Sequence, residues 1–133
     1  MNDEKNDIIE LTLPINAAYV SAARLTASSV SNRLGFSIDE IEDIKAAVSE
    51  ACTYVVKYFS SKNEKNFCIK FKITENQIDI DLTVDAATKL SQDEDDMGLC
   101  MIKALVDKFE LNFDENNYLK ILMIKKHDTS SFD

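Results

Sequence analysis

Residues 41–59 read IEDIKAAVSEACTYVVKYF and contain the clearest structural pattern of the chain. Its apolar side chains recur every three or four residues, which places them on one face of an α-helix. This stripe consists of Ile41, Ile44, Val48, Cys52, Val55 and Phe59. Glu50 and, one helical turn later, Tyr54 lie on another face. The pattern therefore predicts a long helix with two chemically different faces.

A second helix is predicted before this stretch. Asn16 can cap its start, and Gly35 suits the left-handed residue that ends a helix, followed by the apolar Phe36. Ser37 and Glu40 then form a capping-box pattern at the start of the next helix. The buried face of the first helix is predicted to consist of Val20, Ala23, Ala27, Val30 and Leu34.

Two strands with a defined register are predicted after the long helix. A tight turn at residues 75–76 places Lys72 opposite Asp79 and Lys70 opposite Asp81. The other face of this hairpin then carries the apolar pairs Ile73–Ile78 and Phe71–Ile80. A slip of one residue would destroy both patterns, so the register is well specified.

The remaining elements complete an α+β fold. We expect a strand over residues 8–13, a loop over 89–96, a third helix over 97–109 and a last hairpin over 110–113 and 118–126. The inward residues of the third helix are predicted to be Met101, Ile102, Leu105, Val106 and Phe109. Helices would cover one face of a mostly antiparallel sheet, giving a two-layer sandwich. We expect one domain over residues 1–127 and a disordered tail over 128–133.

Composition narrows the function. The 133 residues carry a formal net charge of −9, which argues against binding to nucleic acid. The three cysteines form no C-x-x-C pair, so we expect buried free thiols rather than a disulfide or a zinc site. The single histidine, His127, is expected at the surface. Without a signal peptide or an apolar run of membrane-spanning length, the chain is expected to be cytoplasmic and to bind no membrane.

Four segments resemble a known family. They are ARLT at residues 23–26, DEIEDIK at 39–45, AVSEACT at 47–53 and MGL at 97–99. Together they resemble the GHKL ATPases, which have the Bergerat (histidine-kinase-like) fold. The closer resemblance is to the anti-sigma factor serine kinases that control sporulation and stress sigma factors in Gram-positive bacteria. It spans nearly the whole chain and is most specific over residues 39–53.

The resemblance implies a role for Glu50 and exposes a departure at Tyr54. Glu50 matches the catalytic base, which accepts a proton beside the γ-phosphate of ATP. The family places an Asn four residues later to hold Mg²⁺, but this chain has Tyr54, and a phenol is a poor magnesium ligand. We therefore predict no metal site. Glu50 is predicted to be a relic of the base; the alternative is a base that is still active.

The nucleotide-binding loops depart from the family as well. Asp85 matches the Asp that receives the adenine amino group, but both glycines that should follow it are missing. Gly98 alone remains of the phosphate-binding loop, and four carboxylates at residues 93–96 precede it where an anion would bind. Metal binding by these carboxylates is conceivable, but a solvated, helix-capping run is favoured because EF-hand spacing is absent. The span between Asp85 and Gly98 predicts a shortened ATP lid.

Two functional hypotheses follow from the resemblance. The first is an anti-sigma-like protein, without a cofactor, that binds a sigma factor and an anti-anti-sigma (STAS-type) antagonist, as a homodimer. Arg24 matches the family's partner-contacting Arg, although an exposed arginine is also ordinary on a helix. The second is an active serine kinase that uses Glu50, ATP and Mg²⁺ to phosphorylate the antagonist. A weaker third possibility is one subunit of a pair beside a separate active kinase.

Overall fold

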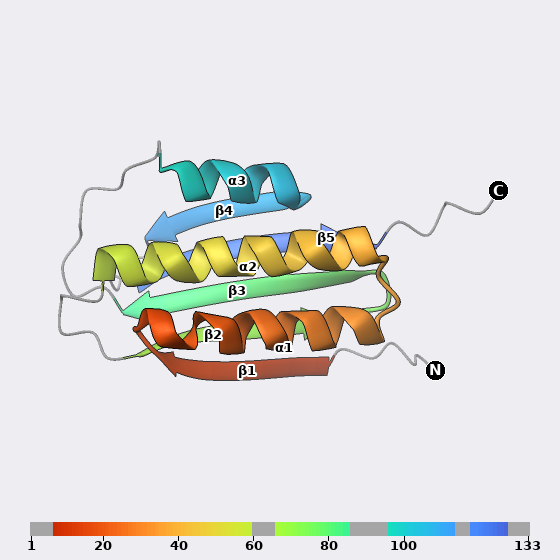
Figure 1. Cartoon of the computed structure of the whole chain (residues 1–133), viewed down its shortest axis with the longest axis horizontal. Helices are drawn as coiled ribbons and strands as arrows, with labels where there is room; N and C mark the ends of the chain where they lie inside the picture. Colours follow the sequence, from red (N-terminus) through yellow and green to blue (C-terminus); the bar gives the residue numbers. More distant parts are fainter. Residues whose placement is uncertain (1–6, 60–65, 86–95, 114–117, 128–133) are drawn as a thin grey trace.

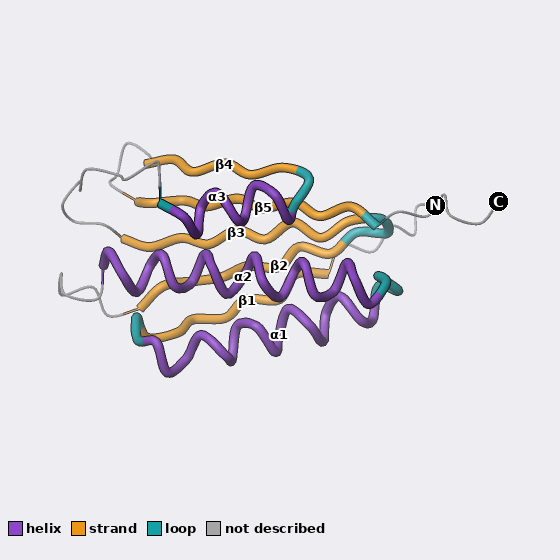
Figure 2. The backbone as a smooth tube through the Cα atoms, turned by 45° about the horizontal axis from the view of Figure 1, so that its top comes forward, coloured by secondary structure: helices purple, strands orange, loops and turns teal. Residues whose placement is uncertain are grey.

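The helices α1, α2 and α3 cover one face of a five-stranded antiparallel sheet (Figures 1 and 2). The computed structural model describes residues 7–59, 66–85, 96–113 and 118–127. In chain order the elements are β1 (Asp7–Pro14), a 3-10 turn η1 (Ala17–Tyr19), α1 (Val20–Arg33), α2 (Ile38–Phe59), β2 (Asn66–Ile73), β3 (Gln77–Asp85), α3 (Met97–Leu105), β4 (Lys108–Phe113) and β5 (Tyr118–Lys126). The predicted α+β sandwich is confirmed.

The sheet has the strand order β1-β2-β3-β5-β4, and every neighbouring pair is antiparallel. In the β2–β3 hairpin Lys72 lies opposite Asp79 and Phe71 lies opposite Ile80, as the alternation predicts. Ile80 in turn lies opposite Met123 of β5. Phe71 and Met123 are fully buried and Ile80 nearly so, because this face of the sheet lies under the helices.

The sequence signals that end one helix and start the next are confirmed. Gly35 has a φ of 81°, and its N–H donates to the carbonyl of Asn32, while the N–H of Phe36 donates to that of Ser31. This is the Schellman arrangement. The capping box forms in both directions: Ser37 Oγ accepts from the Glu40 N–H at 3.1 Å, and Glu40 Oε1 accepts from the Ser37 N–H at 2.7 Å. Asn16 caps η1, which leads directly into α1.

Helix α2 lies in the middle of the helical layer, between α1 and α3 (Figure 1). Its stripe packs on the sheet, and both of its flanks are covered, so Tyr54 is buried as well. Cys52 is fully buried, and burial raises the pKa of its thiol to about 12. All three cysteines are free, but only Cys52 is buried as expected: Cys68 is half-buried on β2, and Cys100 is exposed on α3.

Two expectations about the C-terminal third are wrong. Helix α3 ends at Leu105 because Val106 is extended and the N–H of Asp107 donates to the carbonyl of Ile124, which directs the chain into the sheet. Phe109 therefore belongs to β4 rather than to the helix. Met101 is 44% exposed, and Leu99 takes the buried position beside Ile102.

The end of β5 is tied to the helical layer. Lys125 Nζ donates to the carbonyl of Leu105 at 2.8 Å and pairs with Asp43 of α2 at 3.2 Å. His127, expected at the surface, is instead half-buried, and its Nδ1 lies 3.0 Å from Glu40 Oε1. The predicted tail from Asp128 and the predicted short lid within residues 86–95 lie outside the described residues. Within the described ranges, no helix combines the length and apolarity needed to cross a membrane.

Replacing Phe71 tests the register of the sheet. Because its ring is fully buried under the helices, Phe71→Ala should lower the free energy of unfolding by about 3–5 kcal/mol in urea titrations. Lys72→Ala, on the outer face of the same strand, should change it by less than about 0.5 kcal/mol. Equal losses for the two variants would contradict the observed register.

Candidate functional site

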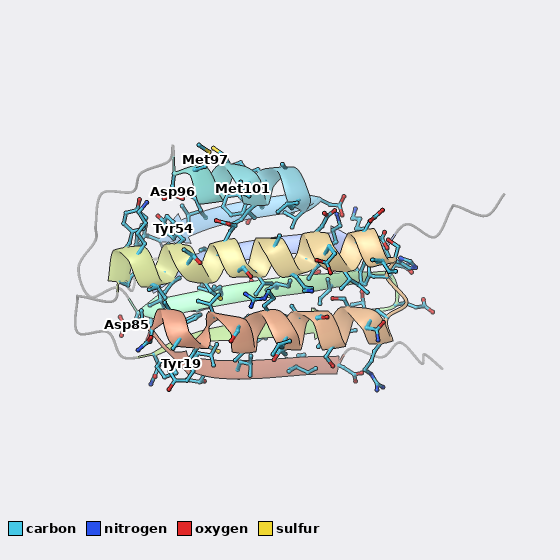
Figure 3. All side chains as sticks on the ribbon, in the orientation of Figure 1. Tyr19, Tyr54, Asp85, Asp96, Met97 and Met101 are labelled. Atoms are coloured by element: carbon cyan, nitrogen blue, oxygen red, sulfur yellow. The ribbon has the colours of Figure 1, made fainter. Side chains whose placement is uncertain are left out.

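A small pocket lies between the C-terminal half of α2 and the start of α3. Its volume is about 150 Å³, and it is lined by Glu50, Thr53, Tyr54, Lys57, Asp96, Met97 and Gly98. Three of the residues that the sequence singles out, Glu50, Tyr54 and Gly98, therefore meet at one place. Figure 3 labels Tyr54, Asp96 and Met97 in this region.

Asp96 is the N-cap residue of α3. Its Oδ1 accepts hydrogen bonds from the N–H groups of Gly98 at 2.8 Å and Leu99 at 3.3 Å. Its Oδ2 accepts from Lys57 Nζ at 3.1 Å and from the Tyr58 hydroxyl at 3.0 Å. The predicted capping role is confirmed at Asp96, but the predicted solvation is wrong there, because the residue is only 7% exposed. Residues 93–95 lie outside the described chain.

The hydrogen bonds around Asp96 keep its carboxyl ionised. Burial alone would raise the pKa of Asp96, but the hydrogen bonds from Lys57, Tyr58, Leu99 and Gly98 outweigh that effect and lower the pKa below its ordinary value. The hydrogen bond to Asp96 likewise raises the pKa of Lys57. Both side chains therefore carry their charges throughout the neutral pH range.

Tyr54, at the position where the sequence resemblance implies a metal-binding Asn, contributes a buried aromatic ring. The side chain is buried, and its ring packs against that of Tyr58 with centroids 4.7 Å apart. Lys57 Nζ lies 5.1 Å from the centroid of the Tyr58 ring on the same helix. Within the described parts of the chain, no group of three His, Cys, Asp or Glu side chains could hold a metal ion. The Tyr54 ring thus packs against Tyr58, whose hydroxyl donates to Asp96.

Glu50 lies against the first turn of α3. A Cβ added at Gly98 would stand 2.7 Å from Glu50 Oε1 and 3.1 Å from Asp96 Oδ1. The absence of a side chain at Gly98 is what lets these two carboxylates approach the helix N-terminus together. The positive end of the α3 dipole therefore faces two negative groups that belong to the protein itself.

Asp85 and Arg24 do not join the pocket. Asp85 is exposed at the end of β3 and is absent from the pocket lining; Figure 3 places it apart from Asp96 and Tyr54. Arg24 is half-buried on α1, and its Nη1 donates to Ser49 Oγ of α2 at 3.3 Å. The predicted adenine contact and the predicted partner contact thus lie outside the pocket around Glu50.

In this arrangement the Asp96 carboxylate neutralises the positive charge of Lys57 and of the α3 N-terminus, which disfavours binding of an external anion there. A phosphate at the α3 N-terminus would have to displace the Asp96 carboxylate from four donors. It would also approach the Glu50 carboxylate, at a cost of about 4 kcal/mol per charge pair at 4 Å and intermediate dielectric.

Lys57 and Tyr58 are site residues that no sequence motif singled out. Their spacing from Glu50 and Tyr54 puts them on the same side of α2, so the helical pattern could have suggested them. Their pairing with Asp96, 39 and 38 residues away, could not be read from the sequence. It depends on how α3 packs beside α2.

Replacing Asp96 by Asn should produce a pH-dependent loss of stability. Because the pKa of Asp96 is lowered by folding, its ionised form stabilises the protein fully above the unfolded pKa, about 3.9, and that contribution disappears as the pH falls through the folded pKa. We expect a loss of about 2 kcal/mol at neutral pH in urea titrations, shrinking below about pH 4.

A control variant separates this effect from general charge removal. Asp39→Asn removes an exposed carboxylate from the first turn of α2 and should cost less than about 1 kcal/mol. A deficit of Asp96→Asn that stays constant or grows on acidification would contradict the assigned interactions.

Comparisons with known proteins identify the family of this chain. The family model described as histidine kinase-like ATPase domain matches residues 13–125. Proteins called serine-protein kinase RsbW from Bacillus thuringiensis (strain Al Hakam) and Bacillus cereus (strain AH820) are each 31% identical to this chain, over 92% of the chain and 86% of the relative.

A solved structure shares the fold. It contains the RsbU and RsbW domains of Rv1364c from Mycobacterium tuberculosis and superposes with a TM-score of 0.73 at 14% identity. The match covers 96% of this chain and about a third of that longer chain, 34%. Taken with the family match over residues 13–125, these likenesses show that the chain belongs to the histidine kinase-like ATPase family and is a relative of the RsbW serine-protein kinases.

Proposed function

We propose that this protein is an anti-sigma-like regulator that binds a sigma factor, and an anti-anti-sigma antagonist of the STAS type, without using ATP. Its framework is that of the RsbW relatives, while its nucleotide site is impaired. The observation that carries this proposal is the Asp96 carboxylate at the N-terminus of α3, where four donors hold it. A nucleotide phosphate would need the same position.

The buried Tyr54 supports the same proposal. It fills the place where a magnesium ligand is expected, and its ring packs on Tyr58. Since Mg²⁺ bridges the phosphates of ATP in kinases of many kinds, loss of its ligand removes both affinity and transition-state stabilisation. Among the described residues, no group of three His, Cys, Asp or Glu side chains could hold a metal ion in its place.

Arg24 is the proposed anchor for the partner. It stands beside the exposed Leu25 on α1 and is held by Ser49 of α2. A guanidinium that is already oriented loses less entropy when a partner carboxylate binds it, and Arg is enriched among residues that dominate binding energy. The proposed homodimer stays a prediction.

A second candidate function is an active serine kinase. It is favoured by the position of Glu50, which lies against Gly98 at the start of α3, and by the identity to proteins named serine-protein kinases. In this alternative Glu50 would accept the proton of a serine hydroxyl on the antagonist. ATP and Mg²⁺ would be required, and Asp96 would have to move away from the α3 N-terminus.

Replacing Arg24 tests the proposed partner surface. Arg24→Ala should weaken binding to the cognate sigma factor by about 30-fold or more, because a buried interfacial Arg contributes about 2 kcal/mol. Calorimetry against each of the host's sigma factors identifies the partner and measures the loss. Arg33→Ala, at the exposed end of the same helix, is the control and should leave binding unchanged. Failure to bind any sigma factor would count against the proposal.

Nucleotide titration separates the two candidate functions. Calorimetry with Mg·ATP should detect no binding tighter than about 100 μM, equivalent to about 5.5 kcal/mol, because the phosphate position is occupied and the metal ligand is missing. Tighter binding that Asp85→Ala abolishes would favour the kinase. Phosphate transfer to an antagonist that Glu50→Gln abolishes would establish it.

A further inference from the structure

We propose that Asp96 is a built-in ligand: it supplies to the N-terminus of α3 the negative charge that a bound phosphate would supply, and so fixes α3 against α2 without a nucleotide. This inference rests on the proposed function, because it explains how the partner surface can stay formed when ATP is not bound. The inference assigns a regulatory property to the same site: α3 stays packed against α2 whether or not a nucleotide is present.

The two carboxylate oxygens of Asp96 contact different helices, which supports this role. Oδ1 accepts from the backbone of α3, at Gly98 and Leu99, whereas Oδ2 accepts from Lys57 and Tyr58 of α2. One carboxylate therefore joins the two helices directly. Backbone N–H groups, a cation and a hydroxyl are also the donors that a protein offers to a phosphate.

The two departures from the family pattern are physically connected. Tyr54 packs its ring on Tyr58, and the Tyr58 hydroxyl donates to Asp96. The residue at the expected metal position thus supports the carboxylate at the expected phosphate position. Independent decay of an unused site would not require such a contact. The two changes form one network that replaces the bound ligand.

The other end of α3 is held by the chain as well. Lys125 of β5 donates to the last helical carbonyl, that of Leu105, at 2.8 Å and pairs with Asp43 of α2 at 3.2 Å. A cation lies at the negative end of the α3 dipole, and the Asp96 anion lies at the positive end. Both ends of this nine-residue helix are therefore neutralised by groups of the protein.

Hydrogen exchange of the 133-residue chain tests the proposal. Wild-type amides of Leu99, Cys100 and Met101 should be protected, and inorganic phosphate should not change their exchange. In Asp96→Gly they should exchange about tenfold faster, because both the cap and the ion pair are lost. Added inorganic phosphate should restore protection in this variant, since the anion position is free. Asp39→Asn should behave as wild type.

Two outcomes would overturn the proposal: α3 amides of Asp96→Gly that exchange as slowly as wild type, or a response to phosphate that is the same in both proteins. If Asp96→Gly fails to fold, Tyr58→Phe replaces it, which removes only the hydroxyl donor. It should accelerate α3 exchange about threefold while leaving amides of β2 and β3 unchanged; unchanged α3 exchange would refute the role. None of these readouts involves a sigma factor, so a failed partner assay would overturn the proposed function alone.

Discussion

The ion pair between Asp96 and Lys57 is the interaction on which the site depends. A carboxylate that is 7% exposed would be costly to bury without donors. Here the donors come from two helices, so the energy that compensates burial also fixes where α3 sits. Gly98, Glu50 and Tyr54 take their observed places around that carboxylate. The carboxylate thereby forms an internal contact between α2 and α3.

Much of the fold follows from local patterns in the sequence. The β2–β3 register was predictable because each strand alternates apolar and charged residues, so only one pairing satisfies both faces. The α1–α2 connection was predictable because Gly35 and the Ser37–Glu40 box act over a few residues. The end of α3 was not predictable, because a hydrogen bond from Asp107 to Ile124 of a distant strand decides it.

Part of the candidate site could likewise be predicted from the sequence, and part could not. The resemblance placed Glu50, Tyr54 and Gly98 in one site, and the structure brings these three together. It did not reveal that Asp96 is buried, because a run of acidic residues ordinarily faces solvent. The partners that make burial tolerable lie 38 and 39 residues earlier, on α2. A contact of this kind depends on how two helices pack, which no local pattern encodes.

In the proposed arrangement, the Asp96 carboxylate occupies the N-terminus of α3 both with and without nucleotide. The most direct test is an NMR titration of the Asp96 side-chain carboxyl, with and without Mg·ATP. We expect a pKa below the ordinary value for Asp, about 3.9, and no change in that pKa when Mg·ATP is added. An ordinary pKa, or a carboxyl signal that shifts when nucleotide is added, would contradict it.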